Sequence, residues 1–228
     1  FAEAWSYYLI KASADLAVEK GACLWNEETK YSAGLTPNQT YKQDVDELVP
    51  HKERMPWREL RDQLKRTGIR NSTLMALMPA ETSAQISNAT NGIEPPRSLV
   101  SVKQSKHGVL KQVVPGIHHL KNKYELLWDQ RSPEGYMSIM AVLQKYIDQG
   151  ISVNTSYNPV FYEDEKINMS EMLRHLLIFY KYGGKQLYYF NTFDGQGEID
   201  IDKLNESANI EVEDEYLLQD EECDSCTI

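Results

Sequence analysis

The chain has 228 residues, of which 41% are hydrophobic and 25% charged. This composition is typical of a globular chain with a buried core and excludes wholesale disorder and fibrous repeats. No apolar run reaches the roughly 18 residues that a membrane span needs. The net charge is −10, but residues 193–228 hold 13 acidic residues and one lysine, which leaves residues 1–192 near neutral. A near-neutral body with an acidic tail argues against general affinity for nucleic acid or a membrane partner.

Periodicity, capping residues and turn residues predict helices that alternate with strands. Helices are expected at residues 1–19, 40–48, 56–66, 79–92, 117–129, 134–149 and 170–182, the last one capped by Ser170. Strands are expected at residues 70–78, 151–159 and 185–192, and as a pair within 94–115 that turns at His107-Gly108. This order predicts an α/β fold with parallel strands, as part of a barrel.

The N-terminus has no basic start, no small-residue cleavage site and no initiator Met, so we expect a processed chain or a piece of a longer one. The cysteines are Cys23, Cys223 and Cys226. An odd number without a secretory signal indicates a reducing compartment, the cytoplasm, despite six possible glycosylation sequons. We expect residues 1–192 to form the folded body and residues 193–228 a mobile acidic tail.

Cys223 and Cys226 form a C-x-x-C pair at the end of this tail. Such a pair can close as a disulfide or provide half of a zinc site. There is no second pair and no nearby histidine, so a redox dithiol is favoured and no metal site is expected. His118, His119 and His175 lack the spacing of metal ligands and are expected to be surface or satisfied core residues.

Two further segments have residue types that suit chemistry. The strand-to-helix turn of Pro79, Ala80, Glu81, Thr82 and Ser83 would present unpaired amides to a phosphate or diphosphate, although plain helix capping explains it equally well. Tyr188 and Tyr189 are adjacent in a strand and should point to opposite faces, as an electron and proton relay or as an ordinary aromatic pair. On residue chemistry alone, the ordinary interpretation of each is favoured. The apolar helix face from Met172 to Tyr180 is expected to be core, or less readily a partner groove.

Taken together, these segments resemble one family. The stretches RNSTLMALMPAETSAQISNATNGIEPPR (70–97), KYIDQGISVNTSYNP (145–159) and KQLYYFNT (185–192), followed by a terminal cysteine pair, occur in the order found in the large subunit of class I ribonucleotide reductase. The chain is similar to the C-terminal third of the class Ia type. The long match around residues 78–95 is very specific, and the tyrosine pair adds independent weight.

The resemblance implies roles for individual residues. The turn from Pro79 to Ser83 corresponds to the loop that binds the ribonucleoside diphosphate, with Ala80 where a close relative has Ser. Tyr188 corresponds to the relay tyrosine beside the radical cysteine, and Tyr189 to its partner that faces the small subunit. The Cys223/Cys226 pair corresponds to the tail dithiol that thioredoxin or glutaredoxin recharges. The Met172–Tyr180 helix resembles the docking region for the tail of the small subunit.

The resemblance also implies what lies elsewhere. The radical cysteine, the two reducing cysteines and the ATP and dATP allosteric sites belong to an N-terminal portion, and a metal-containing small subunit supplies the radical. This chain would bind no cofactor and would form half of a ten-stranded α/β barrel. The implied function is reduction of ribonucleoside diphosphates to deoxyribonucleoside diphosphates for DNA synthesis, with the N-terminal portion and the small subunit as partners. The alternative is a non-catalytic interaction module that assembles with the radical-generating subunit.

Overall fold

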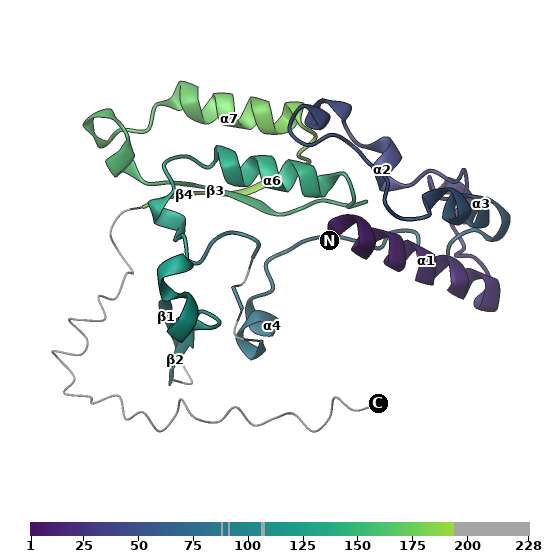
Figure 1. Cartoon of the computed structure of the whole chain (residues 1–228), viewed down its shortest axis with the longest axis horizontal. Helices are drawn as coiled ribbons and strands as arrows, with labels where there is room; N and C mark the ends of the chain where they lie inside the picture. The colour runs from purple at the N-terminus through teal and green to yellow at the C-terminus, as the bar shows by residue number, and fades with distance from the viewer. Residues whose placement is uncertain (88, 91, 106–107, 194–228) are drawn as a thin grey trace.

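The computed structural model describes residues 1–87, 89–90, 92–105 and 108–193, and shows helices arranged around a short parallel sheet (Figure 1). The helices are α1 (Ala2–Lys20), α2 (Pro37–Thr40), α3 (Trp57–Thr67), α4 (Glu81–Ile86), α5 (Ile117–Leu120), α6 (Glu134–Gln144) and α7 (Met169–Lys181). The strands are β1 (Val100–Ser105), β2 (Gly108–Val113), β3 (Val153–Tyr157) and β4 (Leu187–Thr192). Short 3-10 helices occupy Asn26–Glu28, Gln43–Glu47, Lys121–Lys123, Leu127–Asp129, Pro159–Phe161 and Glu163–Glu165. The tail, except for Phe193, and His107 of the expected turn lie outside the described residues.

Parallel pairing forms the centre of the fold. β3 and β4 are parallel neighbours joined through α7, which makes a β-α-β unit. A parallel bridge between Leu77 and Ile151 adds the chain that leads to α4. The predicted α/β class with parallel strands is therefore confirmed. No barrel closes within the residues that the structure describes, so the count of ten strands stays a prediction.

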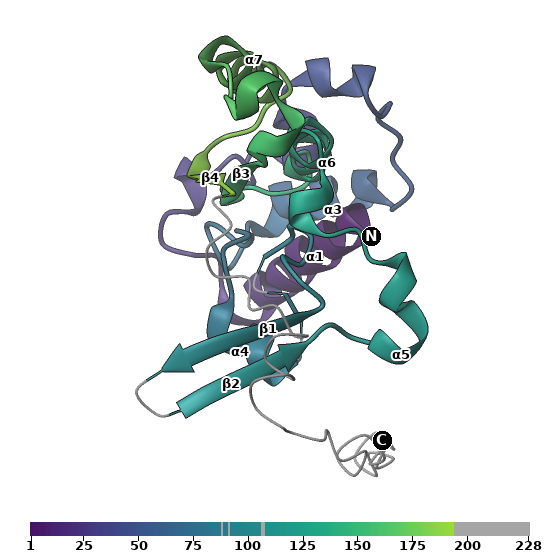
Figure 2. The same ribbon diagram turned by 90° about the vertical axis from the view of Figure 1, so that its left-hand side faces the viewer.

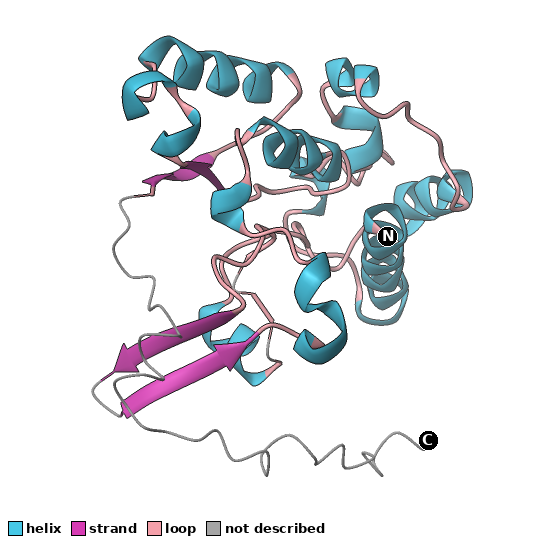
Figure 3. Ribbon diagram, turned by 60° about the vertical axis from the view of Figure 1, so that its left-hand side comes forward, coloured by secondary structure: helices cyan, strands magenta, loops and turns pink. Residues whose placement is uncertain are grey.

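The predicted pair of strands within 94–115 is an antiparallel hairpin. β1 and β2 pair in a regular register from Val100 opposite Val113 to Ser105 opposite Gly108. The hairpin lies at the opposite end of the molecule from α7 (Figure 2). Figure 3 shows it separated from the parallel pair β3–β4. The described strands thus form two small sheets rather than one continuous sheet.

One hydrophobic core joins the helices to the parallel sheet. α1 packs against α3, and α6 packs against both α7 and β3. The inward sides of α1, α3 and α6 supply most of the core's helical residues, at the spacing of the 3.6-residue period. The core residues include Ile10 and Ala14 of α1, Trp57, Leu60 and Leu64 of α3, Met137, Met140 and Ala141 of α6, Val153 of β3 and Phe179 of α7. Among the described residues, no helix is both long and apolar enough to span a membrane.

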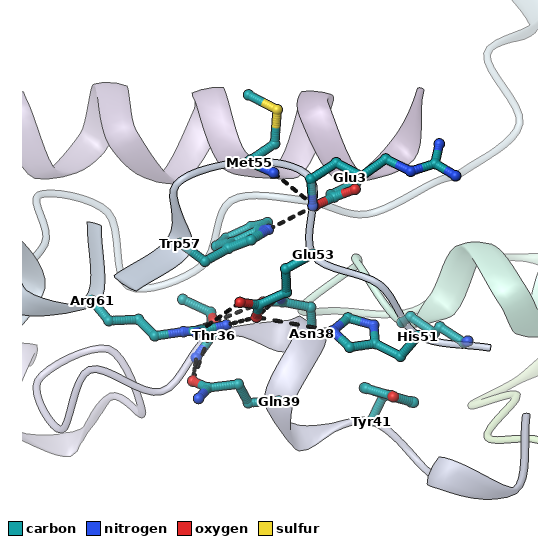
Figure 4. A network of polar contacts seen from close by, with 12 residues as sticks. Glu3, Thr36, Asn38, Gln39, Tyr41, His51, Glu53, Met55, Trp57 and Arg61 are labelled. Atoms are coloured by element: carbon teal, nitrogen blue, oxygen red, sulfur yellow. Dashed lines mark hydrogen bonds and ion pairs between the residues drawn. The ribbon is translucent and has the colours of Figure 1, made fainter. Parts of the chain in front are cut away.

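Polar contacts fasten α1 to the segment that leads into α3 (Figure 4). One oxygen of Glu3 accepts hydrogen bonds from the Met55 amide at 3.1 Å and from Trp57 Nε1 at 3.0 Å. Partial burial works against the charged form of Glu3, but these donors hold the pKa of Glu3 below its ordinary value. In the same figure, Glu53 forms an ion pair with Arg61 of α3. The first helix is therefore held by specific contacts as well as by its apolar stripe.

The predicted helix at 40–48 is only partly correct: a 3-10 helix occupies Gln43–Glu47, and the α-helical turn α2 precedes it. A capping box at Thr36 and a proline at the first helical position start α2 at Pro37. The helix then breaks at Tyr41, which has extended backbone angles and donates its phenol to Asp46 Oδ2 at 2.8 Å. Asp46 in turn pairs with the buried Lys145 at 2.5 Å. Tertiary contacts of Asp46 thus replace a continuous helix with α2 and a 3-10 turn.

The predicted strand at 70–78 pairs only at Leu77. The amides of Leu74 and Met75 donate to the Asp148 carboxylate, at 2.8 and 2.9 Å, instead of to a neighbouring strand. In contrast, the Leu77 amide donates to a backbone carbonyl just before β3, that of Gly150, at 3.2 Å. The Asp148 carboxylate thus accepts the amide hydrogen bonds that would otherwise pair this segment with a neighbouring strand.

Three other helix predictions are too long. The 117–129 segment breaks after residue 123, because the Leu127 amide donates to the Pro96 carbonyl at 2.9 Å. The 134–149 segment ends as a helix at Gln144, and Lys185 donates to the carbonyls of the residues that follow, Ile147 to Gln149. The 79–92 segment is helical only over α4.

The other predicted elements agree with the structure to within a few residues. The cap of α7 differs: Asn168, not Ser170, is the N-cap, and its side chain accepts the Ser170 amide at 3.0 Å.

Candidate functional site

A cavity of about 440 Å³ lies between the chain that enters α4, the base of the hairpin and the β3–β4 pair. Its lining includes Pro79, Glu94, Arg97, Asn154, Tyr188 and Tyr189. The predicted substrate turn and the predicted tyrosine pair, 109 residues apart between Pro79 and Tyr188, therefore reach the same cavity. This convergence makes the cavity the candidate site.

The two tyrosines lie on the same side of β4, and the prediction that they point to opposite faces is wrong. Their ring centroids are 4.3 Å apart with planes inclined at 62°, which is an edge-to-face contact. Val153 pairs with Leu187 but Thr155 pairs with Phe190, so β4 has one extra residue in this interval. This β-bulge breaks the alternation of side chains that a regular strand imposes.

Both rings are accessible. Tyr188 is 51% exposed and Tyr189 56% exposed. The Tyr188 phenol, through hydrogen bonding and its charge, raises the pKa of the Tyr189 phenol above its ordinary value. Tyr189 therefore stays a neutral phenol near neutral pH and keeps the proton that a coupled electron and proton transfer needs.

A buried amide lies beside the pair. Asn154 Oδ1 accepts the Tyr189 amide at 3.2 Å, and Asn154 Nδ2 donates to Glu94 Oε1 at 2.8 Å. Glu94 Oε2 also accepts the Tyr136 phenol at 3.4 Å. Burial, followed by the charge of Glu94, raises the pKa of Tyr136. The cavity wall is thus a connected polar chain rather than a set of separate groups.

The turn from Pro79 to Ser83 leads into α4 as predicted, but it follows a single bridge at Leu77 rather than a strand. The Ala80 carbonyl accepts the first hydrogen bond of α4 from the Ala84 amide at 2.7 Å. Pro79, Ala80, Thr82 and Ser83 are exposed, and Pro79 is the member of the turn that lines the cavity. The backbone geometry required for the turn is present, next to the tyrosines.

The apolar face of α7 is not core, contrary to the interpretation favoured by residue chemistry. Its large side chains are exposed: Met169 (73%), Leu173 (53%), Leu176 (36%), Leu177 (57%) and Tyr180 (66%). The buried residues of this helix are His175 and Phe179. The prediction of a satisfied core histidine holds for His175, which contacts the Tyr157 phenol at 3.2 Å. His118 and His119 lie on the surface, as expected.

Of the three cysteines, Cys23 lies within the part of the chain that the structure describes. Cys223 and Cys226 lie outside the described residues. Cys23 is half-buried with a free thiol. No cluster of potential metal ligands occurs among the described residues.

A second cavity, of about 560 Å³, lies on the other side of the β-α-β unit, at the end of α6. Three of the four lysines that line it have partners. Lys145 pairs with Asp46, Lys185 donates to backbone carbonyls, and Lys42 donates to the Tyr180 carbonyl at 3.2 Å. These cations stabilise the fold, and the cavity contains none of the predicted site residues.

Sequence reasoning did not single out Asn154, Glu94, Arg97 or Tyr136. Asn154 did leave a signal, because it is a polar residue in the middle of a predicted strand. The partners of the Asn154 side chain, Glu94 and the Tyr189 amide, come from two distant segments, and no local pattern connects them.

Comparisons with known proteins identify the family of this chain. Residues 1–190 match the family model described as ribonucleotide reductase, barrel domain. The chain is 54% identical over 193 residues to the ribonucleoside-diphosphate reductase 1 subunit alpha of Salmonella typhimurium, and 53% identical over 193 residues to that of Escherichia coli. Each alignment covers 85% of this chain and 25% of the relative.

Similarity extends over nearly the whole chain in one other relative. The ribonucleoside-diphosphate reductase subunit alpha of Buchnera aphidicola subsp. Schizaphis graminum is 47% identical over 228 residues, which are 99% of this chain and 29% of that protein. The chain thus spans about a quarter of the length of the curated relatives it matches. With its parallel β-α-β unit and a family match over residues 1–190, the chain belongs to the ribonucleotide reductase family.

Proposed function

We propose that this chain is the C-terminal portion of the alpha subunit of a ribonucleoside-diphosphate reductase, acting in the reduction of ribonucleoside diphosphates to deoxyribonucleoside diphosphates. The names of the relatives support this assignment. The observation that carries it is the cavity where Pro79 of the substrate turn meets the Tyr188–Tyr189 contact. A reductase of this class needs a substrate and a radical path to meet at one place.

In this proposal the two tyrosines pass one oxidising equivalent inward. A radical at Tyr189 takes a hydrogen atom, one electron and one proton, from the Tyr188 phenol, which leaves the radical on Tyr188. The ring contact of 4.3 Å supports such an exchange, because it places the two tyrosines next to each other, and the raised pKa of Tyr189 favours its protonated phenol as the product. The oxidant is a radical supplied by a metal-containing small subunit.

The substrate diphosphate would bind at the turn from Pro79 to Ser83. The backbone amides at the start of α4 and the exposed hydroxyls of Thr82 and Ser83 are donors suited to phosphate oxygens. Arg97, in the cavity wall, adds a positive charge nearby. Ala80 lacks a hydroxyl, so binding there depends on backbone donors.

The electrons for the reaction would come from the Cys223/Cys226 dithiol. Reduction of the ribose breaks the C2′–O bond, releases the oxygen as water and consumes two electrons. Oxidation of one dithiol to a disulfide supplies both electrons, and thioredoxin or glutaredoxin returns the pair to the dithiol. The N-terminal portion of the subunit would contribute the radical cysteine, the reducing cysteines and the ATP and dATP sites. The exposed face of α7 would receive the tail of the small subunit.

The test is Tyr189→Phe in the complete reductase complex. Phenylalanine keeps the ring packing but has no phenol to oxidise, so turnover should fall below detection while binding of the ribonucleoside diphosphate is unchanged. Turnover is measured as deoxyribonucleotide formed, and binding by equilibrium dialysis.

The control uses the adjacent pair Tyr7 and Tyr8 on α1, whose ring centroids are 5.2 Å apart in a similar edge-to-face contact. Tyr8 is 60% exposed and lies away from the cavity, so Tyr8→Phe should leave turnover unchanged. Normal turnover in Tyr189→Phe would contradict the relay. A wild-type complex that assembles with the small subunit but shows no turnover would favour the alternative, a non-catalytic interaction module.

A further inference from the structure

The close contact of the two tyrosine rings needs a structural cause. In a regular strand, Tyr188 and Tyr189 would lie on opposite faces. The bulge removes this alternation because both residues lie opposite the single residue Asn154 of β3. A bulge also leaves a backbone amide without its usual partner in the ladder, so something must stabilise it.

The side chain of Asn154 fills this gap. Its Oδ1 accepts the Tyr189 amide at 3.2 Å, so a side chain replaces the missing strand carbonyl. Asn154 is only 8% exposed, which makes an unpaired amide at this place costly. The hydroxyl of Thr155 lies 3.5 Å from the Tyr189 carbonyl, a longer contact to the same residue.

The orientation of the Asn154 amide is itself determined. Nδ2 donates to Glu94 Oε1 at 2.8 Å, and a carboxylate only accepts hydrogen bonds. A flipped amide would place its oxygen against the Glu94 oxygen and its NH₂ group against the Tyr189 N–H. The flip therefore loses both contacts. Tyr136 donates to the second Glu94 oxygen at 3.4 Å and helps to hold the carboxylate in place.

We infer that Asn154, oriented by Glu94, is the positioning residue that stabilises the bulge and so sets the contact between the Tyr188 and Tyr189 rings. The geometric part of this inference stands on the hydrogen bonds and the strand register. Its consequence for catalysis rests on the proposed function, in which one electron and one proton pass from Tyr188 to a radical on Tyr189. Since that exchange requires adjacent phenols, a looser bulge should slow turnover without weakening substrate binding.

The first variant is Asn154→Ala in the complete reductase complex. We expect kcat to fall about tenfold, the effect of losing an interaction worth about 1.4 kcal/mol in the transition state, while KM for the ribonucleoside diphosphate stays constant. Two readouts do not depend on turnover. Hydrogen exchange at the Tyr189 amide should become faster, and the pKa of a fluorotyrosine placed at position 189 should move toward that of the free amino acid.

A double exchange tests the orientation directly. Asn154→Asp alone sets a carboxylate against Glu94 and should behave at least as poorly as Asn154→Ala. Adding Glu94→Gln reverses the amide and carboxylate partners, so one introduced oxygen accepts the Tyr189 amide and the other accepts the introduced NH₂ group. This double variant should recover amide protection, the fluorotyrosine pKa and most of kcat. If the two substitutions only destabilise the fold, their effects on these readouts should add instead of cancelling.

The control is Asn158→Ala, because Asn158 is an amide just beyond the end of β3 that donates to the Trp128 carbonyl and has no contact with the tyrosines. If Asn154→Ala fails to fold, Tyr136→Phe removes one hydroxyl from the same chain of contacts and should shift the readouts in the same direction by a smaller amount.

The outcomes separate the two proposals. Unchanged Tyr189 exchange and fluorotyrosine pKa in Asn154→Ala, or failure of the double exchange to restore them, overturns the inference. If both readouts change and recover as expected while kcat stays constant, the positioning role is supported and the tyrosine relay of the proposed function is contradicted.

Discussion

Replacing Asp148 with asparagine should loosen the chain that leads into the turn from Pro79 to Ser83. Asp148 Oδ2 accepts hydrogen bonds from the Tyr31 phenol at 2.9 Å and from the Leu74 amide at 2.8 Å, and Oδ1 accepts the Met75 amide at 2.9 Å. This carboxylate thus holds a segment that pairs with the sheet only at Leu77. Its partners are separated from it by more than 70 positions in the sequence.

The magnitude follows from the number and type of these bonds. A hydrogen bond to a charged group contributes about 1.5–3 kcal/mol and a neutral one about 1 kcal/mol. In Asp148→Asn the two bonds at Oδ2 become neutral, and the new NH₂ group faces the Met75 amide, a second donor. Asp148 and Tyr31 line the 560 Å³ cavity, so water can replace part of what is lost. We expect the free energy of unfolding to decrease by about 3 kcal/mol.

Two comparisons check this reasoning. Tyr31→Phe removes one of the three bonds and should cost about 1.5 kcal/mol. Asp15→Asn changes the same residue type at an exposed site, where the carboxylate pairs with Lys11, and should stay within about 0.5 kcal/mol of wild type. Unfolding in denaturant gives the free energies. Hydrogen exchange measures the local effect, and the amides of Leu74 and Met75 should lose protection in Asp148→Asn. Undiminished protection at these amides would refute the argument.

Two further predictions concern His175 and the tail. Burial, and then the charge of Arg174, lowers the pKa of His175 from its ordinary 6.5, an effect that neighbouring carboxylates offset only partly. Neutral His175 therefore contributes stability that is present above pH 6.5 and is lost as the pH falls through the lowered pKa, so His175→Gln should flatten this part of the dependence of unfolding free energy on pH. An identical pH dependence in the variant would show that His175 is not its source. In the complete complex, Cys223→Ser with Cys226→Ser should stop turnover with thioredoxin but leave turnover with a small dithiol that reaches the active site directly. Equal losses of turnover with both reductants would contradict the proposal that the tail dithiol carries electrons to the active site.

Elements with strong local signals were predicted well. The helix at residues 1–19 shows an apolar period of 3.6 and ends at a glycine, and the structure has α1 at Ala2–Lys20. The helix at 170–182 stops at Gly183, which has a φ of 89° that favours glycine. These signals come from residues that are close in the sequence, so they do not depend on the tertiary structure.

Predictions failed where a distant polar group changed the local preference. Asp148 takes the amides of Leu74 and Met75, and the expected strand is reduced to one bridge. Asp46, held by Lys145, ends the helix expected at 40–48. In each case the energy of a tertiary hydrogen bond or ion pair outweighs a propensity of a few tenths of a kcal/mol per residue.

The sequence by itself determined the α/β class, the parallel pairing and the family. Those properties depend on local periodicity and on motifs that are contiguous in the chain. Only the tertiary structure decided that Pro79 and the tyrosines share a cavity, that the face of α7 is exposed, and that Tyr188 and Tyr189 touch. The tyrosine contact depends on a bulge opposite Asn154, whose amide is fixed by Glu94 from another part of the chain. A pairing register is a relation between two strands, so neither strand's own sequence contains it.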